Sequence, residues 1–428
     1  MATRAPATSM AAGGAALLPR DGKGMRRPGL RRQLPVASPI STSALVRAAG
    51  GRGRGTAHSR LSDLLREEYE AKSVRLCSSG THALQLAITT AWRDANERGH
   101  VALPAYACYD LATAAAGAQV PVGFFDVAPG NLGPDLESLE RSLTGGASVV
   151  VVAPLYGIPV DWDTIAGMCA DHGAILIEDA AQGHGALWKG RAIGAHGELS
   201  VLSFGRGKGW TGGAGGALLA RGRLADLGAL SLPAGSSRGA EVRTLLRTAA
   251  QQLMGRPSVF GLVAAVPGLQ LGETVYHAPT APTSISGVAA DLAVAHHELA
   301  RSHGARRRSM ADEWAVALRE FPGIDTPDVP TGGTGGYLRY PILVARVPED
   351  PALLRMAARC GIARGYPQPL PRLGVLRSTT GTSHSRRPGA ERLSRALLTL
   401  PTHWQVTRAD RARALDLLAE FFVKGTGR

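Results

Sequence analysis

The sequence predicts an α/β protein whose large domain has a mostly parallel sheet, followed by a smaller α+β domain. Two observations support this fold class. Between residues 61 and 204, short runs rich in Val, Ile and Ala alternate with segments that have the apolar spacing of helices. The apolar runs are continuous, as in strands buried on both faces of a parallel sheet.

Strands and helices of the large domain follow one another regularly. An amphipathic helix is predicted over 59–71, ahead of a strand over 73–78. The next predicted pairs are helix 80–95 and strand 100–105, helix 109–118 and strand 120–127, helix 135–143 and strand 147–157, and helix 163–173 and strand 174–181. A further strand over 198–204 ends just before a run of glycines.

A different pattern begins after residue 231. Residues 232–286 are rich in Gly, Pro and Ser and break the alternation. Beyond them the sequence predicts a long helix over 287–321, a strand over 338–346, and helices over 351–361 and 408–422. We therefore predict a disordered basic extension over 1–33, a large domain over 34–290 and a small domain over 291–428.

Composition is ordinary for a globular protein, with 44% hydrophobic and 19% charged residues among 428. The net charge of +14 is concentrated at the N-terminus, because residues 1–60 hold 11 Lys or Arg and one acid, a net of +10. This basic segment lacks interleaved aromatic residues, so specific nucleic-acid binding is not expected. It also reads like a transit peptide, although the Ala, Gly and Arg bias of the whole chain explains it better.

Cysteine usage and hydropathy indicate a cytoplasmic protein. The four cysteines form no C-x-x-C pair and no zinc spacing, so neither a disulfide framework nor a metal site is expected. No run of about 18 apolar residues predicts a membrane span.

Lys208 stands within the glycine-rich stretch SFGRGKGWTGGAGGALLA, residues 203–220. GKGWTG matches the dinucleotide fingerprint G-x-G-x-x-G, but the glycines that follow would weaken the helix this motif must open. A P-loop requires Ser or Thr after the lysine, and Gly209 follows here. Both phosphate-loop interpretations are therefore rejected.

Three loops at the carboxyl ends of predicted strands carry candidate site residues, where open α/β sheets bind ligands. In CSSGTHAL, Ser79, Thr81 and backbone N–H groups begin a helix and suit a phosphate, although a helix cap explains them about as well. Asp179 ends an apolar strand and has Gln182 three residues later, and a capping role for Asp179 stays open. Lys208 lies five residues after Ser203.

Together these groups suit pyridoxal 5′-phosphate. A lysine can bind the cofactor covalently, an acid can keep the pyridine nitrogen protonated, and a helix N-terminus can bind the phosphate. Each of the three loops thereby gains a role.

Several motifs, in order along the chain, resemble those of the DegT/StrS-type sugar aminotransferases. They are SSGTHAL, PAYACYDLATAA, VVVAPLYGIPVD, LIEDAAQGHGALWKG, SFGRGKGWTGGAGGALL and LPTHWQVTRAD. The resemblance covers about 34–422 and is strongest over 74–220. It implies the fold type I architecture of aspartate aminotransferase and a homodimer with sites at the subunit interface. It also implies transfer of an amino group, usually from glutamate, to a keto group of a nucleotide-linked sugar or a cyclitol.

The resemblance also implies roles for individual residues. Lys208 matches the lysine that binds the cofactor and moves the proton, and Asp179 matches the acid beside the pyridine nitrogen. Gln182 matches the residue near the phenolic oxygen of the ring. The positions that bind the phosphate are matched by Gly80, Thr81 and Ser203.

Some positions depart from the family pattern. Cys108 stands where an aromatic residue commonly stacks on the cofactor, so Tyr106 or Tyr109 is a candidate replacement. GETVYHAPTAPTSIS, residues 272–286, stands where family members have an Asn-x-Arg segment that serves the partner subunit. His184 matches a common family position and suits a structural role as well as a catalytic one.

Two alternative functions stay open at this stage. A dehydratase or epimerase branch of the family commonly has histidine in place of the lysine, so Lys208 argues against that branch. A noncatalytic protein of this fold would not require the complete set of acid, lysine and phosphate site. For the acceptor, Arg206 and the basic segment 296–308 are candidates to bind a diphosphate if they line the mouth of the site.

Overall fold

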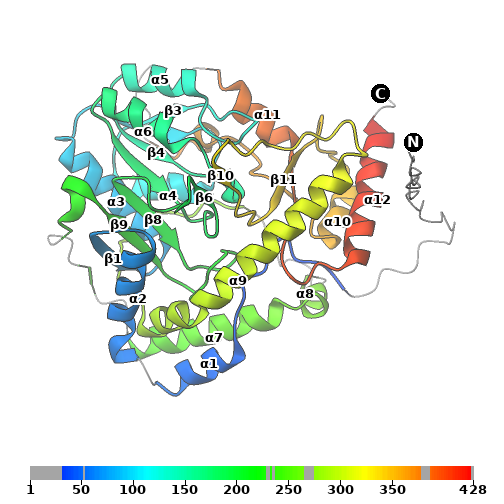
Figure 1. Ribbon diagram of the computed structural model, residues 1–428, viewed down its shortest axis with the longest axis horizontal. Coiled ribbons are helices and arrows are strands. Elements are labelled where there is room, and N and C mark those ends of the chain that lie inside the picture. Colours follow the sequence, from blue (N-terminus) through cyan, green and yellow to red (C-terminus); the bar gives the residue numbers. More distant parts are fainter. Residues whose placement is uncertain are drawn as a thin grey trace, which may run out of the picture.

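The computed structural model describes residues 31–51, 54–227, 232–233, 237–264, 274–376 and 386–425. The predicted α/β class is confirmed by a seven-stranded sheet of order β1-β9-β8-β5-β4-β2-β3 (Figure 1). Its strands are β1 (Ser73–Cys77), β2 (His100–Pro104), β3 (Val122–Phe125), β4 (Ala147–Val152), β5 (Ile175–Asp179), β8 (Leu199–Ser203) and β9 (Gly216–Ala220).

The sheet is mixed but mostly parallel, as predicted. Strands β2, β3, β4, β5 and β8 pair in parallel, while β9 runs antiparallel to both β8 and β1. Both faces are buried: in β4, Val149 and Val151 belong to one hydrophobic cluster, and Val150 and Val152 belong to the other. This burial explains the continuous apolar runs of the sequence.

The large domain also contains helices, and several of them begin at capping side chains. They are α1 (Thr42–Ala49), α2 (Arg54–Glu68), α3 (Gly80–Asp94), α4 (Tyr109–Ala118), α5 (Leu136–Thr144), α6 (Trp162–Asp171), α7 (Arg238–Met254) and α8 (Pro257–Val263). Asp135 and Asp161 cap α5 and α6 by accepting hydrogen bonds from backbone N–H groups. Helices α7 and α8 were not expected, because the glycines and prolines around them masked their apolar spacing.

The second domain contains a three-stranded antiparallel sheet of order β11-β13-β12. Its elements are β11 (Tyr340–Leu343), α10 (Pro351–Arg359), β12 (Ala363–Arg364), α11 (Pro388–Ala396), β13 (Leu397–Leu400) and α12 (Arg408–Gly425). A separate small sheet is formed by β6 (Leu187–Trp188), β7 (Arg191–Ala192) and β10 (Gly333–Thr334).

One continuous helix, α9 (Gly287–Leu318), links the two domains. Figure 1 shows it running from the side of α2 and α7 towards α10 and α12. Ala290 packs in the core of the large domain, whereas Trp314 packs in the core of the small one. The predicted boundary at 290/291 therefore falls inside the first turns of a helix, where the chain has no linker.

The N-terminal boundary also differs from the prediction. Residues 1–30 of the predicted extension lie outside the described residues, but its last three residues, 31–33, are packed against the protein. Gln33 is buried, and its backbone N–H donates to the carbonyl oxygen of Arg359 at 2.8 Å. The packed part of the chain thus includes Arg31.

Candidate active site

The residues predicted to bind the cofactor all line one cavity of about 380 Å³. It lies at the carboxyl ends of β1, β5 and β8, beside the first turn of α3. The candidates that line it are Ser79, Gly80, Thr81, Asp179, Gln182, Ser203 and Lys208. Residues more than 100 positions apart in the sequence meet here, because parallel strands bring their carboxyl ends to one edge of the sheet.

The first turn of α3 packs closely on the end of β8. Ser79 is the N-cap, because its hydroxyl accepts a hydrogen bond from the backbone N–H of His82 at 3.0 Å. A Cβ atom on Gly80 would lie 2.7 Å from Ser203 Cβ, a distance that side chains cannot adopt. The helix N-terminus therefore lies against Ser203, and its first N–H groups offer a place for an anion. The capping interpretation holds for Ser79 and is compatible with an anion at Gly80 and Thr81.

Two adjacent carboxylates, Glu178 and Asp179, have different environments. Glu178 is fully buried, and its oxygens accept four hydrogen bonds, from three backbone N–H groups and the Ser200 hydroxyl. Asp179 lines the cavity, and its Oδ1 accepts one hydrogen bond, from the Ala181 N–H at 3.1 Å. Successive side chains of a strand point to opposite faces, so only Asp179 is available to a ligand.

Burial raises the pKa of Asp179 to about 6, even though the nearby Lys208 ammonium and the Ala181 N–H each lower it. A cationic N–H partner would stabilise the charged form of this buried carboxyl group and so lower its raised pKa. The protonated pyridine nitrogen of pyridoxal phosphate is such a partner.

Gln182 is fixed by two hydrogen bonds. Its Oε1 accepts from the Tyr156 N–H at 3.0 Å, and its Nε2 donates to the Tyr366 hydroxyl at 2.9 Å. The rings of Tyr156 and Tyr366 stack with centroids 6.5 Å apart. Tyr366 comes from the C-terminal part of the chain, so the small domain helps to orient a side chain of the cavity.

The wall of the cavity near α4 contains Cys108 and not an aromatic ring. Tyr106 is fully buried, and its hydroxyl accepts a hydrogen bond from the Tyr366 N–H at 2.7 Å. Tyr109 lines a neighbouring cavity, and its hydroxyl contacts the backbone of Gln368. Neither tyrosine lines the cavity that contains Asp179, so neither takes the stacking position there.

The second, adjoining cavity has a volume of about 680 Å³ and shares Cys108, Asp110, Gln182, Arg206 and Lys208 with the first. Four arginines line it: Arg32, Arg206, Arg339 and Arg364. Lys208 lies at the junction of the two cavities, where a substrate in the second could reach a cofactor in the first.

The basic segment 296–308 does not line either cavity. Arg307 is buried and donates to the carbonyl oxygens of Gly336 and His184, while Arg308 donates to that of Gly185. These arginines hold loops against α9. The segment was a candidate to bind a diphosphate only if it lined the mouth of the site, and it does not line these two cavities. Arg206 is the member of the predicted set that faces the cavities.

His184 also lies away from both cavities. Burial lowers the pKa of His184 to about 3, with Arg307 adding to the effect, so the ring is neutral. Its ring lies 5.6 Å from that of Trp210. Of the two roles considered for His184, structural and catalytic, this position suits the structural one.

Sequence reasoning missed Arg247 and Tyr366. Arg247 lines the first cavity from α7, inside the Gly-, Pro- and Ser-rich region 232–286. Tyr366 lies in a short segment after β12, where no periodic pattern marks it. The spacing of Leu245, Thr248 and Gln252 in α7 is a helical signal that could have revealed the first of these.

Within the described ranges, no group of three or more His, Cys, Asp or Glu side chains is arranged to hold a metal ion. In the same part of the chain, no helix combines the length and apolar character needed to cross a membrane. The residues of the first cavity do fit pyridoxal phosphate, since a helix N-terminus, a buried acid of raised pKa and a lysine meet in one space.

Comparison with known proteins gives a family match over most of the chain. Residues 49–418 match the DegT/DnrJ/EryC1/StrS aminotransferase family. Over 142 residues the chain is 32% identical to L-glutamine:2-deoxy-scyllo-inosose aminotransferase of Streptomyces kanamyceticus, covering 33% of each chain. Over 152 residues it is 34% identical to dTDP-3-amino-3,4,6-trideoxy-alpha-D-glucose transaminase of Streptomyces venezuelae, covering 33% of this chain and 39% of that one. The matched segments thus span about a third of the length of these curated relatives.

Solved structures support the fold over a longer range. An aminotransferase from Streptoalloteichus hindustanus superposes with a TM-score of 0.68 at 22% identity, covering 91% of this chain and 100% of that one. The fold is therefore the type I aspartate-aminotransferase-like fold that the motifs implied.

Proposed function

The chain belongs to the DegT/DnrJ/EryC1/StrS aminotransferase family, and from that premise we propose that it is a pyridoxal-phosphate-dependent aminotransferase. Its acceptor would be the keto group of a nucleotide-linked sugar, a related keto-sugar or a cyclitol. One observation supports this most strongly: Lys208, Asp179 and the first turn of α3 line the same cavity. We also propose a cytoplasmic location, which suits the four free cysteines.

Each residue of the cavity has a distinct task in this proposal. Pyridoxal phosphate, when bound, supplies an aldehyde and a ring that withdraws electrons from the donor's α-carbon. Lys208 would hold the cofactor through its side-chain amine, and the same amine would carry the proton that leaves the donor's α-carbon. Asp179 would accept a hydrogen bond from the N–H of the cofactor's pyridine ring and so favour the protonated ring. Gly80, Thr81 and Ser203 bind the phosphate through N–H and hydroxyl groups.

Lys208→Ala tests this assignment. The wild-type protein, incubated with pyridoxal phosphate and reduced with borohydride, should carry the cofactor on the peptide that contains Lys208. The variant should lose this label and the visible absorbance of the bound cofactor, whereas Lys189→Ala, an exposed lysine paired with Asp163, should keep both. Labelling of another lysine in the variant would remove Lys208 from this role.

For the amino donor we propose glutamate. L-glutamine is the second donor to test, because the relative from Streptomyces kanamyceticus is an L-glutamine:2-deoxy-scyllo-inosose aminotransferase. Each donor is mixed with the cofactor-loaded protein, and loss of the visible band reports transfer of the amino group. If neither donor changes the spectrum and no keto acceptor restores it, the aminotransferase proposal fails.

For the acceptor we propose a keto-sugar that is linked to a nucleotide diphosphate. The four arginines of the second cavity support this, because guanidinium groups bind phosphate oxygens bidentately. The expected result is that nucleotide-linked keto-sugars restore the visible band much faster than free keto-sugars do. Restoration by cyclitols or free sugars alone would refute the nucleotide requirement and leave the aminotransferase proposal intact.

We propose that the enzyme is a homodimer joined through the face formed by α1, α7 and α8. Five apolar side chains on these helices are more than half exposed: Val46, Val242, Leu246, Leu253 and Leu262. Clustered apolar exposure of this kind is typical of an interface. Arg247, next to Leu246, lines the first cavity, so a second copy on this face would border the site.

Leu246→Glu should convert the dimer to a monomer in sedimentation velocity experiments. Val316→Glu is the matched control, because Val316 on α9 is equally exposed but lies outside this face. A Leu246→Glu protein with unchanged mass in solution would refute this interface.

A further inference from the structure

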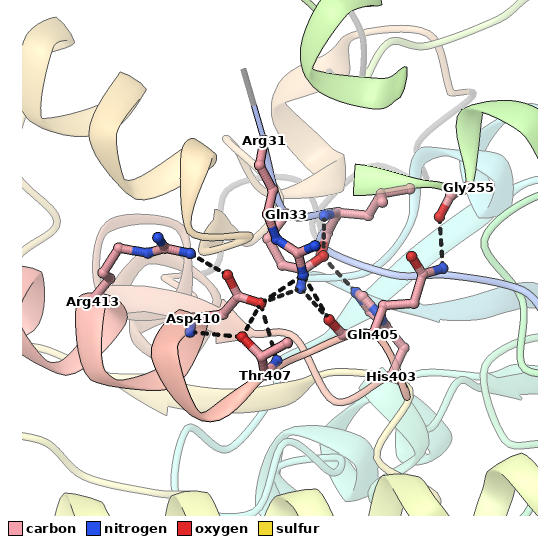
Figure 2. Close-up of polar contacts among 9 residues, drawn as sticks. Arg31, Gln33, Gly255, His403, Gln405, Thr407, Asp410 and Arg413 are labelled. Atoms are coloured by element: carbon pink, nitrogen blue, oxygen red, sulfur yellow. Dashed lines mark hydrogen bonds and ion pairs between the residues drawn. The ribbon is translucent and has the colours of Figure 1, made fainter. Parts of the chain in front are cut away.

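The first described residues form a segment, here called the N-terminal strap (residues 31–40), that touches both domains. Figure 2 shows its beginning at α12, where Gln33 lies among Gln405, Thr407 and Asp410. Gln33 Nε2 donates to the Gln405 carbonyl oxygen at 2.8 Å and to Asp410 Oδ2 at 3.1 Å. His403 Nε2 lies 2.9 Å from the carbonyl oxygen of Leu34. The strap is therefore fixed to the small domain at this end.

Asp410 is the centre of this anchor. Its side chain is 3% exposed and pairs with Arg31 at 3.0 Å, while Arg413 makes a second ion pair with it. It also accepts hydrogen bonds from the backbone N–H and the hydroxyl of Thr407. Burial acts to raise the pKa of Asp410, but the Thr407 hydrogen bonds and Arg31 outweigh it and lower the pKa to about 2. The carboxylate is charged throughout the neutral range.

The other end of the strap contacts the loop of the proposed cofactor-binding lysine. Ser38 Oγ donates to the carbonyl oxygen of Lys208 at 2.9 Å and accepts from the N–H of Gly207 at 3.2 Å. Gly207 has φ +74°, and a Cβ atom there would lie 3.3 Å from Val36 Cγ1. One hydroxyl thus bridges backbone groups of two consecutive residues, the N–H of Gly207 and the carbonyl oxygen of Lys208, and Val36 packs beside Gly207.

The Lys208 loop needs such external support. Glycines at 205, 207, 209, 212 and 213 give its backbone a large conformational freedom. Two side chains hold its C-terminal half. The Thr211 hydroxyl donates to the Phe204 carbonyl oxygen, and Trp210 Nε1 donates to the Ala293 carbonyl oxygen. Ser38 binds the N-terminal half of the loop, at Gly207 and Lys208.

Between its two ends the strap is short and stiff. Four residues separate Gln33 from Ser38. Pro35 restricts φ among them, and Pro39 restricts φ directly after Ser38. Residues 34–38 also line the arginine-rich cavity. A shift of α12 relative to the large domain would therefore reach the Lys208 backbone through a few fixed residues.

We propose that the N-terminal strap is a positioning element for Lys208. Ser38 fixes the backbone of Gly207 and Lys208, and the Gln33–Asp410 anchor ties that backbone to the small domain. This inference rests on the proposed role of Lys208 in binding the cofactor. Ser38 acts through Lys208 and does not take part in bond making.

The test compares Ser38→Ala with Ser38→Thr, which keeps the hydroxyl, and with Ser302→Ala, which removes an exposed hydroxyl bonded to a backbone carbonyl on α9. Hydrogen exchange of the peptide covering 204–210 is measured first, since it needs no cofactor. Ser38→Ala should exchange faster in this peptide, while Ser38→Thr and Ser302→Ala should match the wild type. Unchanged exchange in Ser38→Ala would overturn the proposal.

The second readout uses the cofactor-loaded protein. Ser38→Ala should slow the half-reaction with the amino donor by about tenfold to a hundredfold, as expected for a misplaced catalytic group. The pH at which the visible band of the bound cofactor changes should also move, and Ser38→Thr should restore both values. Faster exchange with a wild-type rate and spectrum would overturn the positioning role.

Asp410→Asn tests the anchor, and the double variant with Ser38→Ala tests the coupling. We expect Asp410→Asn to slow the half-reaction less than Ser38→Ala does, and the double variant to be slower by less than the product of the two effects. If the rate of the double variant falls by the full product of the two single effects, the anchor and Ser38 act independently, and the proposed coupling along the strap is wrong. A wild-type protein that binds no pyridoxal phosphate would instead refute the proposed function, and hydrogen exchange alone would then decide whether Ser38 holds the loop.

Discussion

Asp179→Asn should make the cofactor-free protein more stable while it removes activity. The pKa of Asp179 is raised from 3.8 to about 6, chiefly by burial. A carboxyl group whose pKa is raised on folding favours the folded state when protonated, and this contribution is lost as the pH rises through about 6. At pH 8 the ionised group therefore destabilises the folded state, and a neutral Asn does not.

The size of the effect follows from the shift of about 2 pH units. At about 1.36 kcal/mol per unit, the variant gains about 3 kcal/mol in the free energy of unfolding at pH 8. The same relation gives about 1.5 kcal/mol at pH 5 and almost nothing below pH 4. The transamination half-reaction should fall sharply at all of these pH values, because the ring nitrogen loses the acid that keeps it protonated.

Urea unfolding of the cofactor-free proteins at pH 8 and pH 5 measures the difference. Glu178→Gln is the matched control, since it changes the neighbouring carboxylate, whose oxygens accept four hydrogen bonds. That variant should lose about 2 kcal/mol or more, because an amide group would face backbone donors. An Asp179→Asn protein no more stable than the wild type at pH 8, or a gain that does not depend on pH, would refute the reasoning.

Three further predictions follow from the packing. Gly80→Ala should lower the free energy of unfolding by about 1–3 kcal/mol and weaken cofactor binding in a spectroscopic titration, because its Cβ would lie 2.7 Å from Ser203 Cβ; unchanged binding would place the phosphate elsewhere. A chain that starts at Pro35 should be about 3 kcal/mol less stable to urea than one that starts at Arg31, since it lacks the buried Gln33 and its hydrogen bonds; equal midpoints would show that this anchor adds nothing. Asp410→Asn should also destabilise the protein at pH 7, and the difference should fade as the pH drops from about 4 to 2, because a carboxylate of lowered pKa loses its contribution on protonation; a difference that persists at pH 2 would contradict this.

Much of the large domain could be predicted because its signals are local. Strands such as β4, with its run of valines, and helices such as α5, with an Asp cap, are specified by side chains within a few residues. The α7 helix was missed for the same reason, since the glycines and prolines on both sides dominated the local pattern. The predicted strand over 338–346 was longer than β11, Tyr340–Leu343, because propensity does not show where pairing with β13 ends.

The class of the fold and the groups that line the proposed site could be predicted from the sequence, because residues at the ends of parallel strands must meet at one edge of the sheet. The tertiary structure was needed to show that the neighbouring carboxylate, Glu178, is buried and accepts four hydrogen bonds. It also decided that Gln33 reaches Asp410, 377 residues away, and that Ser38 reaches Lys208, 170 residues away. Such contacts depend on how finished elements pack, and a one-dimensional pattern of propensity and spacing carries no record of that packing.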